Sequence, residues 1–165
     1  MAHRKLESVR VRYQFVCGYC GISEVDAGGL LTIDHFVPIS AKGGDDDDNL
    51  VYSCIRCNQY KAAYHAAISV KLDGRTLLHP LRNDLSSHLK LNEISGELEG
   101  LSVSGAFHIS LLQLNRPALI AHRRRKSYWK LAELVHMTLL SEVIDLESTV
   151  ANLTRQLAIL EDNRG

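Results

Sequence analysis

The sequence lacks net charge. Its 19 Lys and Arg residues balance 19 Asp and Glu residues over 165 positions, so the chain as a whole has no attraction to a polyanion. Long apolar runs are also missing, because no stretch approaches the roughly 18 consecutive apolar residues of a membrane span. The N-terminus carries charges without the apolar run of a secretory leader. We therefore expect a cytoplasmic protein without a membrane segment, in which any nucleic-acid surface is a local basic cluster.

The 45% share of hydrophobic residues is typical of a folded globular chain. Its length suits one ordinary domain, or a small module with an appendage. The character of the sequence changes after the first third, where short runs of Leu, Val, Ile and Ser replace a cysteine-containing segment. We therefore expect two parts, residues 1–70 and residues 71–165.

Cysteine is scarce, but its four copies form two Cys-x-x-Cys pairs, Cys17/Cys20 and Cys54/Cys57. Thiolates from two such pairs can close one tetrahedral zinc site. In a reducing compartment this arrangement favours zinc, whereas an exported chain would make two disulfides, and buried free thiols are a third alternative. We expect structural zinc, which would hold the chain between the pairs as a rigid motif.

Between the cysteine pairs, Asp34 and His35 follow a short β-prone run at residues 30–33. A strand end is a rigid platform for such a pair. The acidic run at residues 45–48 is interpreted as a solvated loop, with the alternative that it tunes metal capture or repels misplaced phosphate. Asn49 opens another ordered stretch, although an Asn in this position is often only a turn or helix cap.

Elsewhere, residues 6–15 suit a short helix that leads into an extended stretch, and residues 55–67 suit a second helix. Residues 77–114 alternate apolar residues with Ser and contain glycines, which predicts short strands in a small antiparallel sheet. Pro117 fits the first turn of a helix that continues to the end of the chain. The five histidines at positions 65, 79, 88, 108 and 122 have no metal-ligand spacing, so we expect surface or core residues.

The last helix carries apolar residues at alternating spacings of four and three over three heptads. They are Leu139, Val143, Leu146, Val150, Leu153, Leu157 and Leu160. This pattern predicts a coiled-coil seam, with the alternative of an amphipathic helix that packs on its own domain. A homodimer or a partner protein would both use the helix at residues 139–160.

Three motifs together resemble the HNH endonucleases over about residues 5–65: the stretch at residues 34–44, then Asn49-Leu50, then Cys57-Asn58-x-x-Lys61. That family has a ββα-metal fold, in which two strands and a helix hold one catalytic divalent cation. The resemblance implies an α+β protein. We expect a zinc-stapled ββα-metal nuclease module, followed by a small antiparallel β region and C-terminal helices.

The resemblance also implies a role for each matching residue. His35 would be the general base, because a neutral imidazole can take a proton from the attacking water near neutral pH. Asp34 and Asn58 would hold a catalytic Mg²⁺ or Mn²⁺ through oxygen ligands. Asn49 would orient the loop and the His35 ring through hydrogen bonds to backbone. The alternative is a structural role, in which Asp34 and His35 only orient the cysteine motif.

One position differs from the residue signature that the name HNH abbreviates, because Asn58 stands where that name implies a second histidine. An amide oxygen is a harder ligand than an imidazole nitrogen. This choice therefore favours Mg²⁺ or Mn²⁺ over Zn²⁺ or Ni²⁺ at the catalytic position.

The basic cluster Arg123, Arg124, Arg125 and Lys126 lies in a segment without acidic residues. With Lys61, it is our candidate for contacts with DNA phosphates, which give affinity without sequence choice. The alternative is a solvated basic helix face. The sequence thus predicts a metal-dependent DNA endonuclease. The competing hypothesis is a zinc-stapled nucleic-acid or protein binding module, active only within a larger partner complex.

Overall fold

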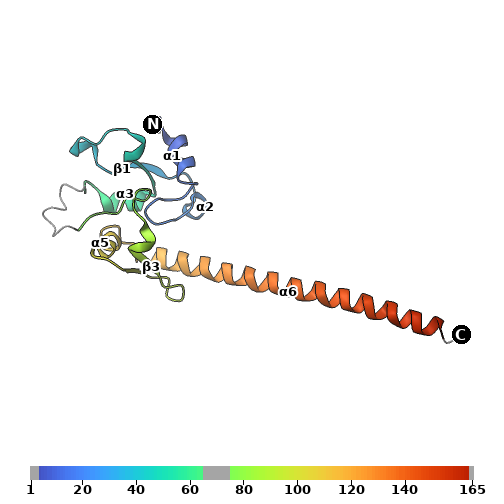
Figure 1. Ribbon diagram of the computed structural model, residues 1–165. Coiled ribbons are helices and arrows are strands. Elements are labelled where there is room, and N and C mark those ends of the chain that lie inside the picture. The colour runs from blue at the N-terminus through green and yellow to red at the C-terminus, as the bar shows by residue number, and fades with distance from the viewer. Residues whose placement is uncertain (1–3, 65–74, 164–165) are drawn as a thin grey trace. The chain divides into compact units, whose positions relative to one another are not determined.

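The computed structural model describes residues 4–64 and 75–163 (Figure 1). The chain divides into two compact units, Met1–Arg124 and Arg125–Gly165. The boundary that we expected at residue 70 lies outside the described residues and stays a prediction.

The N-terminal part contains the two strands and the helix that the family resemblance implies (Figure 1). Strands β1 (Thr32–His35) and β2 (Leu50–Ser53) form an antiparallel pair in which Asp34 lies opposite Val51 and His35 opposite Leu50. Helix α3 follows directly. The full order is α1 (Leu6–Arg12), α2 (Glu24–Ala27), β1, the 3-10 turns η1 (Ile39–Ala41) and η2 (Asp47–Asn49), β2 and α3 (Ile55–Lys61).

The expected strand is present but lies two residues later than the β-prone run at residues 30–33, so the Asp34–His35 pair forms its last two residues. The helix predicted over residues 55–67 is shorter in the structure. It ends at Lys61 because Ala62 has a φ of 48°, outside the helical region. Residues 65–67 of that prediction lie outside the described residues.

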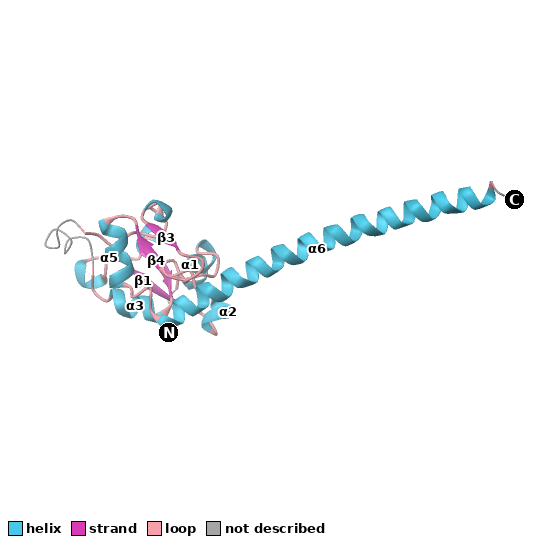
Figure 2. Ribbon diagram, turned by 90° about the horizontal axis from the view of Figure 1, so that it is seen from below, coloured by secondary structure: helices cyan, strands magenta, loops and turns pink. Residues whose placement is uncertain are grey.

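The following segment contains the turn η3 (Leu85–Ser87), strands β3 (Leu89–Leu91) and β4 (Leu98–Gly100), and helix α5 (Val103–Leu111). Figure 2 shows β3 and β4 as neighbouring strands, and they pair antiparallel. The small antiparallel sheet predicted within residues 77–114 is therefore confirmed at β3 and β4, whereas helix α5 in the same range was not predicted. Ser102 begins that helix, since its hydroxyl accepts a hydrogen bond from the Gly105 amide at 3.0 Å, as an N-cap residue does.

Helix α6 runs from Pro117 to Asp162, which confirms the predicted start and the helical C-terminal region. The core of the first unit combines side chains from both ends of that unit. It includes Val9, Val51, Tyr52, Leu112, Leu114 and Leu119. The α5 region and the first turn of α6 therefore belong to the same core as the β1–β2 pair.

The architecture is α+β, as predicted, with a four-cysteine cluster, two small antiparallel strand pairs and a long C-terminal helix. Across residues 4–64 and 75–163, no helix is both long and apolar enough to cross a membrane.

Candidate active site

The four cysteines come together in one cluster. The Sγ atoms of Cys17, Cys20, Cys54 and Cys57 all lie within 4.8 Å of one another, and all four cysteines are free thiols. A pair of disulfides would instead bring sulfurs together in twos, at about 2.05 Å. The geometry therefore favours one shared site over the two bridges that the sequence left open.

This cluster fits a zinc ion. Tetrahedral Zn–S bonds of about 2.3 Å imply sulfur–sulfur distances of roughly 3.8 Å, and the Sγ atoms of Cys20 and Cys54 are 3.8 Å apart. Cys54 also caps helix α3, because its sulfur accepts a hydrogen bond from the Cys57 amide. The same residue thus anchors both the cluster and the start of the helix.

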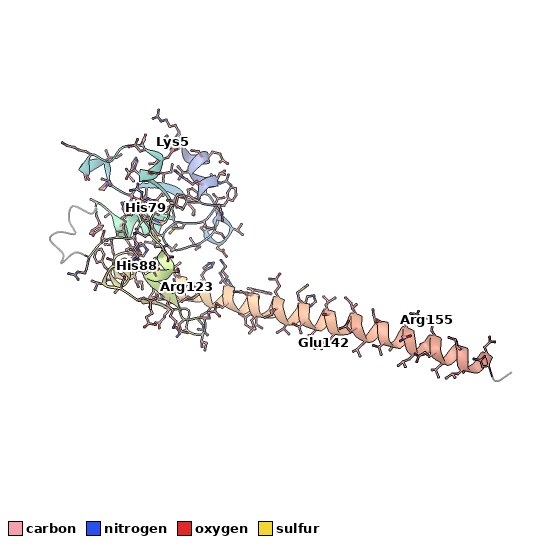
Figure 3. All side chains as sticks on the ribbon, in the orientation of Figure 1. Lys5, His79, His88, Arg123, Glu142 and Arg155 are labelled. Atoms are coloured by element: carbon pink, nitrogen blue, oxygen red, sulfur yellow. The ribbon has the colours of Figure 1, made fainter. Side chains whose placement is uncertain are left out.

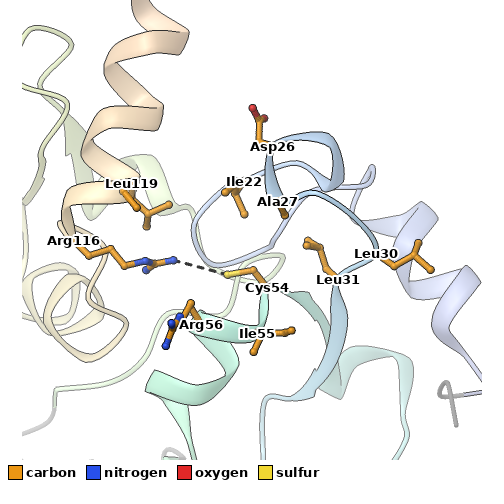
Figure 4. A pocket seen from close by; sticks show the side chains of 11 residues that line it. Ile22, Asp26, Ala27, Leu30, Leu31, Cys54, Ile55, Arg56, Arg116 and Leu119 are labelled. Atoms are coloured by element: carbon orange, nitrogen blue, oxygen red, sulfur yellow. Dashed lines mark hydrogen bonds between the residues drawn. The ribbon is translucent and has the colours of Figure 1, made fainter.

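An arginine approaches the cluster from the segment before α6. Nη2 of Arg116 lies 3.9 Å from the sulfurs of both Cys54 and Cys57. Its guanidinium also stacks on the ring of Tyr60 at 5.7 Å. Figure 4 shows Arg116 reaching Cys54 across a pocket of about 330 Å³, which Ile22, Leu31 and Leu119 help to line. A cation in this position offsets the negative charge of coordinated thiolates.

The carboxylate of Asp34 is buried and held from two sides. The hydroxyl of Tyr19, inside the first cysteine pair, donates to it at 2.6 Å. The ammonium of Lys61, from the last turn of α3, lies 3.1 Å away. Lys61 also donates to the backbone carbonyl of His35 at 2.7 Å. These contacts connect the cysteine motif, β1 and α3 around one carboxylate.

Burial raises the pKa of the Asp34 carboxyl, while the neighbouring Lys61 ammonium and the Tyr19 hydroxyl act in the opposite direction. A carboxylate has about four lone-pair directions, and the two contacts with Tyr19 and Lys61 leave room for another ligand. The carboxylate is therefore compatible with cation binding, although a cation there would share it with the Lys61 ammonium.

His35 lies beside the acidic loop. Its Nε2 atom is 2.8 Å from Oδ1 of Asp45, and its side chain is 15% exposed, so the ring is partly open to solvent. Asp45 is the first residue of the acidic run, which we had interpreted as a solvated loop.

Asn49 clamps the loop between β1 and β2. Its Oδ1 accepts from the Val37 amide at 2.7 Å, and its Nδ2 donates to the carbonyls of Val37 and Gly44 at 3.0 and 2.8 Å. The loop passes so close to itself that a Cβ at Gly43 would lie 1.8 Å from the Val37 carbonyl oxygen. Both side-chain ends of Asn49 are therefore engaged with the backbone of this loop, while its effect on the His35 ring stays a prediction.

Asn58 lies three residues before Lys61 on α3. Residues at this spacing share a helix face, and the Lys61 side chain reaches Asp34. Asn58 and Lys61 therefore lie close together around the α3 axis, and a cation site shared by Asn58 and Asp34 stays a prediction. Carboxylate and amide oxygens form a suitable donor set for Mg²⁺.

The acidic loop is partly covered by basic side chains from the N-terminal helix region. Lys5 Nζ lies 2.7 Å from Oδ1 of Asp47 and donates to the carbonyl of Asp45 at 2.8 Å. Arg12 donates to the carbonyl of Asp47 at 2.6 Å. Asp46, Asp47 and Asp48 are exposed, as expected for a solvated loop, and the basic side chains hold part of that loop in place.

The candidate nucleic-acid residues fall into two groups. Lys61 is only 1% exposed. Arg123 donates to the carbonyls of Gly96 and Leu114 at 2.6 and 2.7 Å, so both side chains have structural partners. Arg124, Arg125 and Lys126 are exposed. Phosphate contact by any of the five stays a prediction, and the three exposed residues are the accessible ones.

Of the histidines that lacked ligand spacing, three are buried, namely His79, His108 and His122. His79 shows how one is used: its Nε2 lies 3.0 Å from the Asp48 carbonyl, and its ring packs edge-on against Phe36. His65 lies outside the described residues.

Three contacts at the site were missed by sequence reasoning: that of Tyr19 with Asp34, that of Asp45 with His35, and that of Arg116 with the cysteine cluster. Tyr19 stands inside a Cys-x-x-Cys pair, and Asp45 directly follows two glycines. Those neighbours could have drawn attention to them. Arg116 reaches the cluster across 59 and 62 positions of sequence, and no local pattern indicates such a contact.

Comparison with known protein families gives a match over the N-terminal part of the chain. Residues 17–63 match the family described as HNH endonuclease. The matched range contains both cysteine pairs, Asp34, His35, Asn49 and Asn58. Comparisons with curated proteins and with solved structures gave no match. The ββα order and the four-cysteine cluster lie in the same range, so the match and the geometry agree on an HNH endonuclease domain at residues 17–63.

Proposed function

We propose that the protein is a metal-dependent endonuclease that hydrolyses phosphodiester bonds of DNA. The observation that carries the proposal is the joining of Asp34, His35 and Lys61 at the end of β1, inside the matched range. Phosphodiester hydrolysis needs an activated water, charge stabilisation at the phosphate and fixed geometry.

His35 is the proposed general base. A neutral imidazole that donates its Nε2 proton to Asp45 keeps its lone pair on Nδ1, and that lone pair can accept the proton of the attacking water. The 2.8 Å contact with Asp45 supports a proton on Nε2, because a carboxylate oxygen accepts the hydrogen bond. The clamp by Asn49 supports a fixed loop around the ring, which keeps the base oriented.

Asp34 and Asn58 are the proposed ligands for Mg²⁺ or Mn²⁺. The cation, when bound, would polarise the scissile phosphate and stabilise the charge on the leaving oxygen. Asp34 is kept in place by Tyr19 and Lys61. Lys61 has a second function here, because its bond to the His35 carbonyl fixes the backbone of the base relative to α3.

The four cysteines are proposed to hold zinc as a structural ion. Tyr19 lies between Cys17 and Cys20 and donates to Asp34. An ordered cysteine cluster would therefore position a hydrogen bond to the proposed catalytic metal ligand, and the structural and catalytic ions would be coupled through one side chain.

Arg124, Arg125 and Lys126 are proposed to contact phosphates. All three are exposed and adjacent in sequence on α6. Such contacts would add affinity for nucleic acid without sequence selectivity. The net charge of the chain is zero and adds no such affinity.

The test is cleavage of supercoiled plasmid by the zinc-loaded protein with Mg²⁺ or Mn²⁺, beside a sample containing a chelator for those cations. We expect nicked or linear DNA only with the cation, and ends that carry 5′-phosphate and 3′-hydroxyl groups and are therefore resealed by a ligase. Asn58→Ala should lose this activity, whereas the exposed Asn152→Ala on α6 should keep it. Absence of cleavage with either cation by a folded, zinc-loaded protein would contradict the proposal.

A second candidate is a binding module that becomes active only within a partner complex. The observation that favours it is the engagement of Asp34 by the buried Lys61 ammonium, which would compete with a cation for the same carboxylate. In that case the isolated protein binds nucleic acid without cutting it. The proposed partner surface is the helix at residues 139–160, for a second copy of this chain or for another protein.

A further inference from the structure

The seven residues of the predicted seam lie exposed along α6. Leu139, Val143, Leu146, Val150, Leu153, Leu157 and Leu160 are between 51% and 64% exposed. Within the described part of α6, no residue after His122 is buried. A repeated apolar stripe of this length on one helix is typical of a surface that another helix covers.

The choice of residues along the seam indicates a two-stranded coil. Val143, Val150 and Leu157 each lie four positions after the preceding seam residue. The other four seam residues are all Leu. In heptad terms, the first set occupies position a and the Leu residues occupy position d. β-branched residues at a with Leu at d favour two helices over three or four.

The positions that flank the seam determine which helix can pair with it. These are the residues directly before each a position and directly after each d position, at 140, 142, 147, 149, 154, 156 and 161. Their charged members are Glu142, Glu147 and Glu161, and none is basic. Figure 3 labels Glu142 and also Arg155. Arg155 occupies a position outside the seam and its flanks.

A second copy of this chain is a poor occupant. In a parallel pair, Glu142 of one helix would face Glu147 of the other. In an antiparallel pair, the positions before a face the same positions of the other helix, and so do the positions after d. Any two charged residues that face each other are therefore again carboxylates. Residues 131–163 carry six carboxylate side chains and one arginine, and this excess adds to the repulsion.

We propose that residues 139–160 of α6 form a two-stranded coiled coil with a helix of a different protein, whose flanking heptad positions carry Lys or Arg. The apolar seam supplies the contact, and the three glutamates select a basic partner and disfavour self-association. This interaction surface is independent of the nuclease proposal, because it involves no residue of the candidate active site.

The test uses the full chain and two synthetic helical peptides of about four heptads. Both peptides carry Val at a and Leu at d, one with Lys and the other with Glu at the flanking positions. Titration of labelled peptide, without DNA or divalent cation, measures binding. The Lys peptide should bind roughly 10- to 100-fold more tightly than the Glu peptide, from three charge pairs that change sign. Glu142→Lys with Glu147→Lys and Glu161→Lys should reverse this order.

Seam variants control for the site of binding. Leu146→Asp with Leu153→Asp should abolish binding of the Lys peptide, while Ser148→Asp with Asn152→Asp, which adds the same charge outside the seam, should retain it. Sedimentation equilibrium of the full chain alone at micromolar concentration should give the monomer mass. A dimer mass without peptide, equal affinity for the two peptides, or no binding of either would overturn the proposal.

Discussion

The ammonium of Lys61, on α3, lies 3.1 Å from the carboxylate of Asp34, on β1, and the two side chains are 0% and 6% exposed. Removal of one partner from such a buried pair leaves an uncompensated charge. Lys61→Met should therefore lower the free energy of unfolding by about 3–5 kcal/mol. Denaturant unfolding of the zinc-loaded protein, followed by near-UV circular dichroism, measures the change.

Two further variants define the cause of this loss. Lys126→Met removes an exposed lysine and should change stability by no more than about 0.5 kcal/mol. Lys61→Met combined with Asp34→Asn should lose less than the sum of the single changes, because the two groups interact. A loss for Lys61→Met no larger than that for Lys126→Met would show that the pair does not stabilise the fold.

Arg116 should tighten zinc binding. Its guanidinium lies 3.9 Å from the sulfurs of both Cys54 and Cys57, and loss of a group that contacts metal ligands typically lowers metal affinity about 10- to 100-fold. Arg116→Gln should show such a loss in competition with a chromophoric chelator, whereas Arg125→Gln, on the exposed part of α6, should not. Equal zinc affinity for both variants would contradict this role.

Much of the first module could be predicted from its sequence, because its signals are local. The paired cysteines, the β-prone run before Asp34 and Pro117 at a helix start each occupy a few neighbouring positions. The four-sulfur cluster and β1 are where those signals placed them. The same holds for the backbone contacts of Asn49, which lie within the loop that begins after β1.

The remaining features depend on contacts between distant segments. The partners of Lys61 lie 26 and 27 positions away. The sequence motif around Lys61 suggested a contact with phosphate, whereas in the structure the side chain is buried in an ion pair with Asp34. Arg123 looked like part of a basic cluster, but it binds the Gly96 carbonyl. Residues 103–111 alternate in polarity as a strand would, yet the Ser102 cap begins a helix there.

His108 should make stability sensitive to acid. Burial lowers its pKa to about 4, whereas an unfolded histidine has a pKa of about 6.5. The unfolded chain therefore binds a proton at higher pH than the folded chain does. The stabilising effect is complete above about pH 6.5 and is lost as the pH falls towards about 4, by up to roughly 3 kcal/mol.

This effect is measured as a difference between wild type and His108→Leu in urea unfolding across that pH range. Acid effects on other groups occur in both proteins and cancel in the comparison. Wild type should lose more stability than the variant as the pH falls. Parallel pH profiles would show that His108 is protonated equally in the folded and unfolded chains.

The exposed residues Arg124, Arg125 and Lys126 should contribute to the salt dependence of DNA binding. Each phosphate contact adds about 0.9 to the slope of log affinity against log salt concentration on duplex DNA. Substitution of all three by Gln should reduce that slope by up to about 3 and weaken binding similarly on unrelated sequences. Lys90→Gln, at an exposed position of β3, is the control. An unchanged slope in the triple variant would place the phosphate contacts elsewhere.

The most direct test of the nuclease account is the effect of His35→Ala on cleavage rate and on DNA affinity, measured on the same zinc-loaded preparation with Mg²⁺. A general base acts on the reaction, so the rate should fall by about 100- to 10,000-fold while affinity stays the same as in wild type. Cleavage by His35→Ala at the wild-type rate would contradict the assignment of His35 as the base. A rate loss explained entirely by weaker binding would contradict it as well.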